Sequence, residues 1–176
     1  TTRGLWHDEA RYLETYWSTW PNVWHHGDFA SRDADGQWYI HGRSDDTMKI
    51  AGKRTGPAEI ESLLMATGRL AEAAAVAVPD PVKGSALVVV CVAKPGASAD
   101  AELCAELGQA IVRGLGPPFK PSRVIVLSDL PRTRNMKIMR RVIRAACAGE
   151  DAGDLSSLLN PEVVSELRMR CAGPVR

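Results

Sequence analysis

The stretch that decides the fold is residues 71–93, AEAAAVAVPDPVKGSALVVVCVA. Its two apolar runs, 71–79 and 85–93, predict neighbouring strands, because the turn formers Pro79-Asp80-Pro81 and Lys83-Gly84 separate them. A third short apolar run at 123–128 predicts one more strand. Helical patterns lie between and around these runs, so the sequence predicts an α+β fold with helices packed on a small three-stranded sheet.

Further elements are predicted on both sides of this stretch. An aromatic pattern at helical spacing predicts a short helix within 5–20, and a turn at 33–36 joins two expected strands. Gly52 marks a small hairpin, and Pro57 suits the first position of a helix. The expected strands are 23–31, 37–42 and the hairpin 47–54; the expected helices start at 57, span 100–114 and 138–147, and start again at Asn160-Pro161.

Composition excludes several classes of protein. A net charge of +1 over 176 residues gives no general attraction to nucleic acid or membranes. No apolar run approaches the length of a membrane span, and no signal peptide opens the chain. The four cysteines lack C-x-x-C spacing, which favours reduced thiols in the cytoplasm over disulfides or zinc. His25 and His26 would point to opposite faces of a strand, which argues against a shared metal ion.

Three motifs occur in order along the chain: Gly27-Asp28-Phe29, the run 42–54 (GRSDDTMKIAGKR) and the run 131–141 (PRTRNMKIMRR). Together they resemble the C-terminal part of AMP-forming acyl-CoA synthetases, most closely the acetyl-CoA synthetase group. The resemblance covers residues 1–168. It implies three parts: the end of an N-terminal adenylation domain at 1–43, a C-terminal mobile domain at 44–148, and a tail with a short helix at 149–176. No segment resembles the family's phosphate loop, so the chain is expected to be a fragment that is inactive alone.

The resemblance makes Lys137 the catalytic residue. The family joins ATP and a carboxylate into an acyl-adenylate, releases diphosphate, and then transfers the acyl group to coenzyme A. A lysine that bridges the two anions reduces their repulsion as the bond forms. The family usually has Ser-Gly before this lysine, whereas this chain has Asn135-Met136, so the loop lacks that glycine. By spacing alone, a solvated lysine in a basic stretch would be the simpler interpretation.

The same resemblance assigns nucleotide contacts. Asp28 matches an aspartate that accepts hydrogen bonds from both ribose hydroxyls, and His26 stands before it where Thr is more common. Arg43 matches a residue that also reaches the ribose, and Arg54 matches an arginine near the phosphates. Asp45 matches the hinge about which the C-terminal domain moves between adenylation and thioester formation. Without the resemblance, each of these would be interpreted as a turn aspartate or a surface arginine.

Further matches concern coenzyme A and a cation. Ala51 and Gly52, in the 47–54 hairpin, would lie against the pantetheine; relatives often have Ser at the position of Ala51. Arg113 lies one place from an arginine that contacts the coenzyme A nucleotide. Main-chain carbonyls of Met65, Thr67 and Leu70 match a place where some relatives hold a cation. The complete enzyme is expected to use ATP, CoA and Mg.

Two other functions remain open from the sequence. One is a non-catalytic regulatory or interaction module whose exposed lysine is modified by a protein lysine acetyltransferase and restored by a deacetylase. The other is nucleic-acid binding, which a basic stripe would support but near-neutral net charge disfavours. The stripe consists of Arg132, Arg134, Lys137, Arg140, Arg141 and Arg144.

The resemblance also implies a short acyl substrate, such as acetate or propionate.

Overall fold

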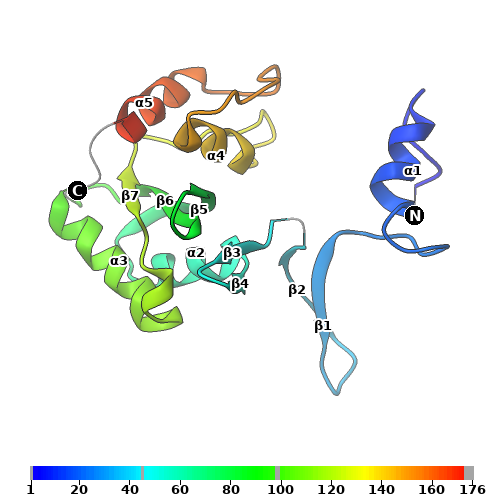
Figure 1. The fold of residues 1–176 in the computed structure, drawn as a ribbon, viewed down its shortest axis with the longest axis horizontal. Coiled ribbons are helices and arrows are strands. Elements are labelled where there is room, and N and C mark those ends of the chain that lie inside the picture. The colour runs from blue at the N-terminus through cyan, green and yellow to red at the C-terminus, as the bar shows by residue number, and fades with distance from the viewer. Residues whose placement is uncertain (1, 45, 98–99, 173–176) are drawn as a thin grey trace. The chain divides into compact units, whose positions relative to one another are not determined.

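The computed structural model describes residues 2–44, 46–97 and 100–172. It divides into two compact units, residues 1–45 (unit 1) and 46–176 (unit 2), each of which is described by itself. The predicted division at 43 and 148 came from the family resemblance and stays a prediction. The segment after 148 contributes a helix to unit 2 (Figure 1).

Unit 2 contains the predicted three-stranded sheet. Its strands are β5 (Leu70–Asp80), β6 (Gly84–Ala93) and β7 (Arg123–Val126), in the order β5-β6-β7. β5 and β6 form an antiparallel hairpin, and β6 pairs in parallel with β7. The turn between β5 and β6 is closed by Asp80, whose carboxylate accepts hydrogen bonds from the amides of Val82 and Lys83. The parallel pairing requires a crossover, which helix α3 (Ala101–Leu115) supplies.

Helices cover both faces of this sheet, which explains why its strands are apolar almost throughout. Alternate residues of β5 and β6 face α2 (Pro57–Ala66) and α3, and the residues between them face α4 (Arg140–Ala148) and α5 (Pro161–Ala172). Figure 1 shows the sheet between these two helical layers. The α+β prediction of a three-stranded sheet with packed helices is therefore confirmed.

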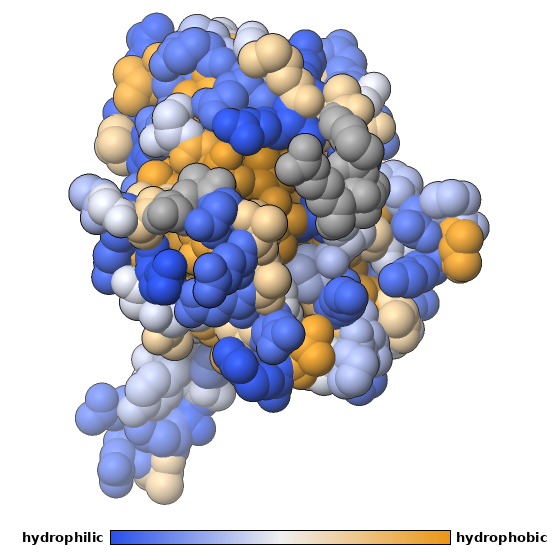
Figure 2. Space-filling model, turned by 90° about the vertical axis from the view of Figure 1, so that its left-hand side faces the viewer, coloured by the Kyte–Doolittle hydropathy of each residue, from blue (hydrophilic) through white to orange (hydrophobic). Residues whose placement is uncertain are grey.

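One edge of the sheet is less well covered. β7 is the last strand, and its Val124 and Val126 are only half buried. Figure 2, which views the side on which β7 lies in Figure 1, shows hydrophobic surface between hydrophilic side chains. Among the described residues, no helix is long and apolar enough to cross a membrane.

Short hairpins precede the sheet, as predicted. β3 (Met48–Ile50) and β4 (Lys53–Thr55) pair in unit 2, and β1 (Asp28–Arg32) pairs with β2 (Trp38–Arg43) in unit 1. Unit 1 begins with α1 (Glu9–Trp17), which is capped by the Asp8 side chain. Trp6 and Trp20, which flank α1, are exposed, whereas Tyr12 within it is buried.

Two predicted boundaries are wrong for identifiable reasons. The strand expected at 23–31 starts only at Asp28, because the amide of His25 donates to the Tyr16 carbonyl and holds the chain against α1. The helix expected from residue 138 starts at Arg140, because Ile138 pairs with Arg132 in an isolated bridge. The second difference shapes the loop that contains Lys137.

Candidate functional site

Lys137 lies at the end of a tight turn, residues 133–137, between two short extended segments. We call it the lysine turn. The amide of Met136 donates to the Thr133 carbonyl at 2.8 Å, and the amide of Thr133 donates to the Lys137 carbonyl at 2.9 Å. The Thr133 hydroxyl accepts a further bond from the Lys137 amide at 3.2 Å. Arg132 and Ile138 pair just outside the turn. The backbone of Lys137 is therefore held in place, while the residue is exposed to solvent.

Met136 has a backbone conformation that glycine adopts most easily. Its φ angle is 62°, in the left-handed region, where a side chain is disfavoured. The acyl-CoA synthetases that the chain resembles usually have glycine at this position. The structure therefore keeps the backbone shape that such a glycine allows and accommodates a methionine in it.

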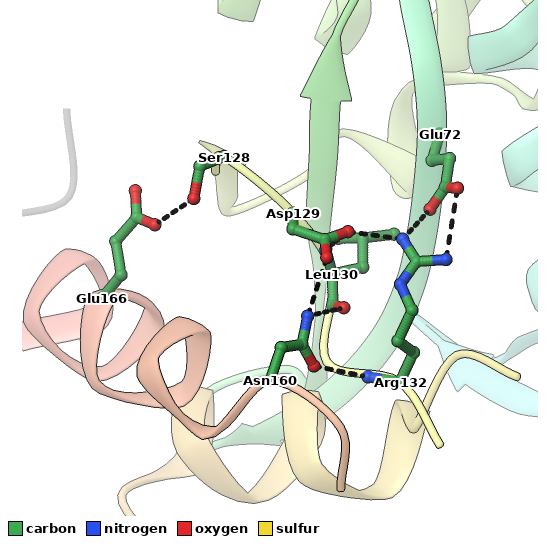
Figure 3. Close-up of polar contacts among 7 residues, drawn as sticks. All are labelled: Glu72, Ser128, Asp129, Leu130, Arg132, Asn160 and Glu166. Carbon is green, nitrogen blue, oxygen red and sulfur yellow. Dashed lines mark hydrogen bonds and ion pairs between the residues drawn. The ribbon is translucent and has the colours of Figure 1, made fainter. Parts of the chain in front are cut away.

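Arg132 connects this turn to the sheet. Its Nη2 lies 2.7 Å from Oε2 of Glu72 on β5 and 2.5 Å from Oδ1 of Asp129, while only 8% of its side chain is exposed (Figure 3). Burial raises the pKa of Asp129, but hydrogen bonds from Arg132 and Leu130 and the Arg132 charge outweigh it, so the pKa is lowered. Asp129 is thus held as a carboxylate beside the buried guanidinium.

Asn160 connects the same turn to the start of α5. Its Oδ1 accepts from the Arg132 amide at 3.1 Å, and its Nδ2 donates to Asp129 at 2.8 Å and to the Leu130 carbonyl at 2.9 Å. Asn160 is 7% exposed, so all three bonds are made away from bulk water. Sequence reasoning gave Asn160 only the role of a helix start. The hint that the sequence offers is the apolar pair Leu158-Leu159 just before it, of which the structure buries Leu158 and leaves Leu159 exposed.

The helix that follows the lysine turn is anchored separately. Arg140 Nε and Nη2 donate to the two oxygens of Glu61 on α2, at 3.0 and 2.7 Å. Glu61 also accepts from the Ala75 amide of β5 at 3.0 Å. Burial lowers the pKa of Arg140, but the bonds and charge of Glu61 outweigh it, so the pKa is raised. The residues before and after the lysine turn are therefore tied to different elements, Arg132 to β5 and Arg140 to α2.

The basic stripe does not form one continuous cationic surface. Arg132 and Arg140 are paired with carboxylates, and both terminal nitrogens of Arg141 donate to carbonyls of Ala152 and Asp154. Arg144 lies 4.0 Å from Glu150. These contacts favour structural roles for the four arginines.

Asp28 and Arg43 are brought together in unit 1. They are opposite each other in the β1–β2 pairing, and Nη1 of Arg43 lies 3.8 Å from Oδ1 of Asp28. Nη1 also donates to the His26 carbonyl at 3.2 Å, beneath Gly27, whose φ is 86°. His26 takes part unexpectedly, since its Nδ1 lies 2.5 Å from Oδ2 of Asp28. Sequence reasoning missed this contact, which occupies one of the two carboxylate oxygens.

The 47–54 hairpin has one side that is exposed and basic and one side that is buried in the core. Its two turn residues, Ala51 and Gly52, both have positive φ angles of 47° and 81°, as a type I′ turn requires. Both are exposed, and no atom lies within 4 Å of the position where a Gly52 Cβ would stand. Arg54 is exposed and pairs with Lys49 across the hairpin. The other side of the hairpin, with Met48 and Ile50, is buried in the core.

The remaining coenzyme A assignment, Arg113, and the cation assignment stay predictions. Arg113 is exposed in the last turn of α3, where a cation is also favourable to the helix dipole. The Met65 carbonyl accepts a hydrogen bond from the Gly68 amide, while Thr67 and Leu70 lie at the α2–β5 connection. No cluster of His, Cys, Asp or Glu side chains suited to a metal occurs in the described part of the chain. The predicted hinge residue, Asp45, lies outside the described residues.

Comparison with known proteins agrees with the motifs. Residues 59–137 match the AMP-binding enzyme C-terminal domain family. The chain is 39% identical to an acetyl-coenzyme A synthetase of Pyrobaculum arsenaticum and 41% identical to one of Salmonella typhimurium. These alignments cover 97% and 94% of this chain but 27% and 26% of the relatives. The chain thus spans about a quarter of the length of these curated relatives.

Solved structures agree as well. The acetoacetyl-CoA synthetase from Streptomyces lividans matches with a TM-score of 0.75 and 25% identity, over 93% of this chain and 25% of that one. An ATP-bound RpMatB-BxBclM chimera matches with a TM-score of 0.70 and 26% identity, over 81% of this chain and 28% of that one. Residues 59–137 run from the first turn of α2 through the three-stranded sheet to Lys137. These residues belong to the AMP-binding enzyme C-terminal domain family, and the chain is similar to the C-terminal part of acetyl-coenzyme A synthetases.

Proposed function

We propose that this chain is the C-terminal part of an AMP-forming acyl-CoA synthetase, an acid–thiol ligase. The complete enzyme would convert a carboxylate, ATP and CoA into acyl-CoA, AMP and diphosphate through an acyl-adenylate. The observation that carries the proposal is that Lys137 is exposed on a hydrogen-bonded turn, within the residues that match the family. The names of the relatives support acetate or another short-chain acid as the substrate.

Lys137 would act in the first half-reaction. The attacking carboxylate and the α-phosphate are both anions, so their approach is opposed by charge repulsion. An ammonium group between them offsets that repulsion and stabilises the negative charge that develops on the phosphate oxygens. Lysine suits this role because its charge is compact and its four-carbon stem extends beyond a fixed backbone.

Unit 1 would supply nucleotide contacts. The Asp28 carboxylate would accept hydrogen bonds from the ribose hydroxyls, with Arg43 beside it as a donor. His26 now contacts one oxygen of the Asp28 carboxylate. When ATP binds, His26 would either move away or share that carboxylate with the ribose. Arg54, which belongs to unit 2, would approach the phosphates, and Mg, the ion expected with ATP, would offset their charge.

The hairpin turn would serve the second half-reaction. Ala51 and Gly52 are small and exposed, so the pantetheine of CoA could lie close to their backbone. Arg113 would contact the CoA nucleotide, and carbonyls of Met65, Thr67 and Leu70 would hold a cation. Asp45, at the end of unit 1, would be the hinge for alternation between the two half-reactions.

This chain alone would not complete the reaction. The relatives are about four times longer, and we expect the carboxylate pocket and the phosphate loop to lie in an N-terminal adenylation domain, which would be the main partner of this chain. The four free thiols support a reducing compartment such as the cytoplasm. An exposed Lys137 could also be acetylated by a protein acetyltransferase and restored by a deacetylase, which would switch adenylation off and on.

The alternative of a purely regulatory module has no support in the comparisons, because the curated relatives named above are synthetases. The test is acetate-dependent exchange of diphosphate into ATP. A full-length enzyme that carries this chain should catalyse it, and the 176-residue chain alone should release no diphosphate above a buffer blank. Diphosphate release by the pure chain, or no exchange by the full-length enzyme with any short-chain acid, would contradict the proposal.

A further inference from the structure

The segment just before α5 forms part of the lysine turn, although it lies outside the family-matching residues 59–137. The amide of Leu159 donates to the Arg132 carbonyl at 2.8 Å, and the amide of Arg134 donates to the Ser157 carbonyl at 3.3 Å. Thr133 and Leu158 pair between these two bonds. Residues 157–159 therefore lie alongside residues 132–134 as a short antiparallel partner.

Asn160 fixes the register of this partner segment. Its amide side chain makes three hydrogen bonds, to the Arg132 amide, Asp129 and the Leu130 carbonyl (Figure 3). A hydrogen-bonded side chain this well buried is costly to remove, because its former partners lose their bonds away from water. Asn160 therefore joins the partner segment to the approach of the lysine turn at three points.

The residues held in this way are those that close the turn around Lys137. Arg132 pairs with Ile138 on one side of the turn, while its carbonyl and amide are held by Leu159 and Asn160. The guanidinium of Arg132 is held by Glu72 and by Asp129, which also accepts a hydrogen bond from Asn160. The side chain and backbone of one residue thus fix the base from which Lys137 projects.

We infer that the segment 157–160 positions Lys137, and that Arg132 and Asn160 are positioning residues for adenylation. The inference rests on the proposed function of Lys137. A lysine must hold its ammonium between two reacting anions, and a small displacement of its backbone is enough to lose much of that effect. The C-terminal segment is then part of the catalytic apparatus and acts through Lys137.

A nearby contact provides a matched control. The Ser128 hydroxyl donates to Glu166 on α5 at 2.9 Å, so it also joins α5 to the segment before the turn (Figure 3). Ser128 is exposed, and this contact touches none of the residues that close the turn around Lys137. Ser128→Ala should therefore weaken α5 docking without moving Lys137.

The first measurement is native-state hydrogen exchange on the unmodified 176-residue chain. The amides of Thr133 and Lys137 should share one opening with the Leu159 amide, so their protection factors should agree within about threefold. An unprotected Leu159 amide beside protected Thr133 and Lys137 amides would overturn the inference. This measurement needs no variant and no substrate.

The second measurement compares the half-reactions in a full-length enzyme that carries this chain. Asn160→Ala should lower acyl-adenylate formation by about tenfold while thioester formation from supplied acyl-adenylate and CoA changes less than twofold. Ser128→Ala should leave both unchanged, and Arg132→Lys should resemble Asn160→Ala. Equal loss of both half-reactions in Asn160→Ala would overturn the inference. If Lys137→Ala itself spares adenylation, the proposed function fails; if only Asn160→Ala spares it, this inference alone fails.

Discussion

The guanidinium of Arg132 lies 2.7 Å from the carboxylate of Glu72, and this pair connects the lysine turn to the first strand of the sheet. The Arg132 side chain is 8% exposed and that of Glu72 is 37% exposed. Arg132 Nε is buried and has no hydrogen-bond partner in the described part of the chain. Stabilisation of the buried charge of Arg132 therefore depends on the two carboxylates that contact its terminal nitrogens.

Removing Glu72 should destabilise the protein more than removing a comparable surface glutamate. We expect Glu72→Ala to lower the free energy of unfolding by about 1–3 kcal/mol, because a buried cation then keeps Asp129 as its main partner. Glu106→Ala is the control, since Glu106 lies 3.5 Å from Arg69 at the surface. It should cost less than about 1 kcal/mol. Urea unfolding measures both, and equal losses would contradict the role given to the buried pair.

The fold could be predicted from sequence because its signals are local. Apolar runs at 71–79 and 85–93, punctuated by Pro and Gly, indicate the hairpin, and residues such as Pro57 indicate where helices start. Lys137 was identified only through the resemblance, because a lysine within a basic stretch has no distinguishing periodicity. Its surroundings agree with that identification without testing its role.

The support around Lys137 could not be predicted in the same way. Three separate parts of the sequence supply these residues: Glu72 on β5, Asp129 and Arg132 just before the lysine turn, and Asn160 just before α5. They meet only when β5 and α5 pack together. A basic stripe predicts an exposed Arg132, but the structure buries it, because two carboxylates offset the cost of removing its charge from water. The His26–Asp28 contact was missed because it depends on how the chain turns at Gly27.

Two glycines of α3 should respond to alanine in opposite ways. A Cβ at Gly114 would lie 2.5 Å from Leu63 Cδ1 of α2, whereas a Cβ at Gly108 would lie 3.6 Å from Pro121 Cγ. Gly114→Ala should therefore lose about 1–3 kcal/mol through overpacking against Leu63, which opposes the gain in helix propensity and makes this variant less stable than Gly108→Ala. Gly108→Ala should stabilise by about 0.5–1 kcal/mol through helix propensity. Thermal unfolding tests this pair, and a stable Gly114→Ala would contradict the close α2–α3 contact.

Met136 should tolerate glycine better than a β-branched residue. At a φ of 62°, Met136→Gly relieves a penalty of about 1 kcal/mol and adds a similar entropic cost, so stability should change by less than about 1 kcal/mol. Met136→Val should cost more than about 1 kcal/mol, because β-branching disfavours this region strongly. Comparable stabilities of the two variants in urea would contradict the left-handed geometry of the turn.

Asp45→Pro should separate the two half-reactions in a full-length enzyme. Proline fixes φ near −65° and restricts the preceding Ser44, so a hinge that needs two backbone conformations would keep one. If the adenylation pose is kept, acyl-adenylate forms but transfer to CoA fails. Asp45→Ala is the control, because it leaves the torsions free. Full turnover by the proline variant would exclude Asp45 as the pivot, and equal damage by alanine would replace the torsional explanation with a role for the carboxylate.

The most direct test of the account is Lys137→Ala in a full-length enzyme that carries this chain, with each half-reaction measured separately. We predict that acetate-dependent acyl-adenylate formation falls by about a hundredfold or more, because one electrostatic donor is lost where two anions meet. Thioester formation from supplied acyl-adenylate and CoA should be largely retained, and acetylation of Lys137 should give the same split until a deacetylase reverses it. An equal fall in both half-reactions, or none in the first, would contradict the account.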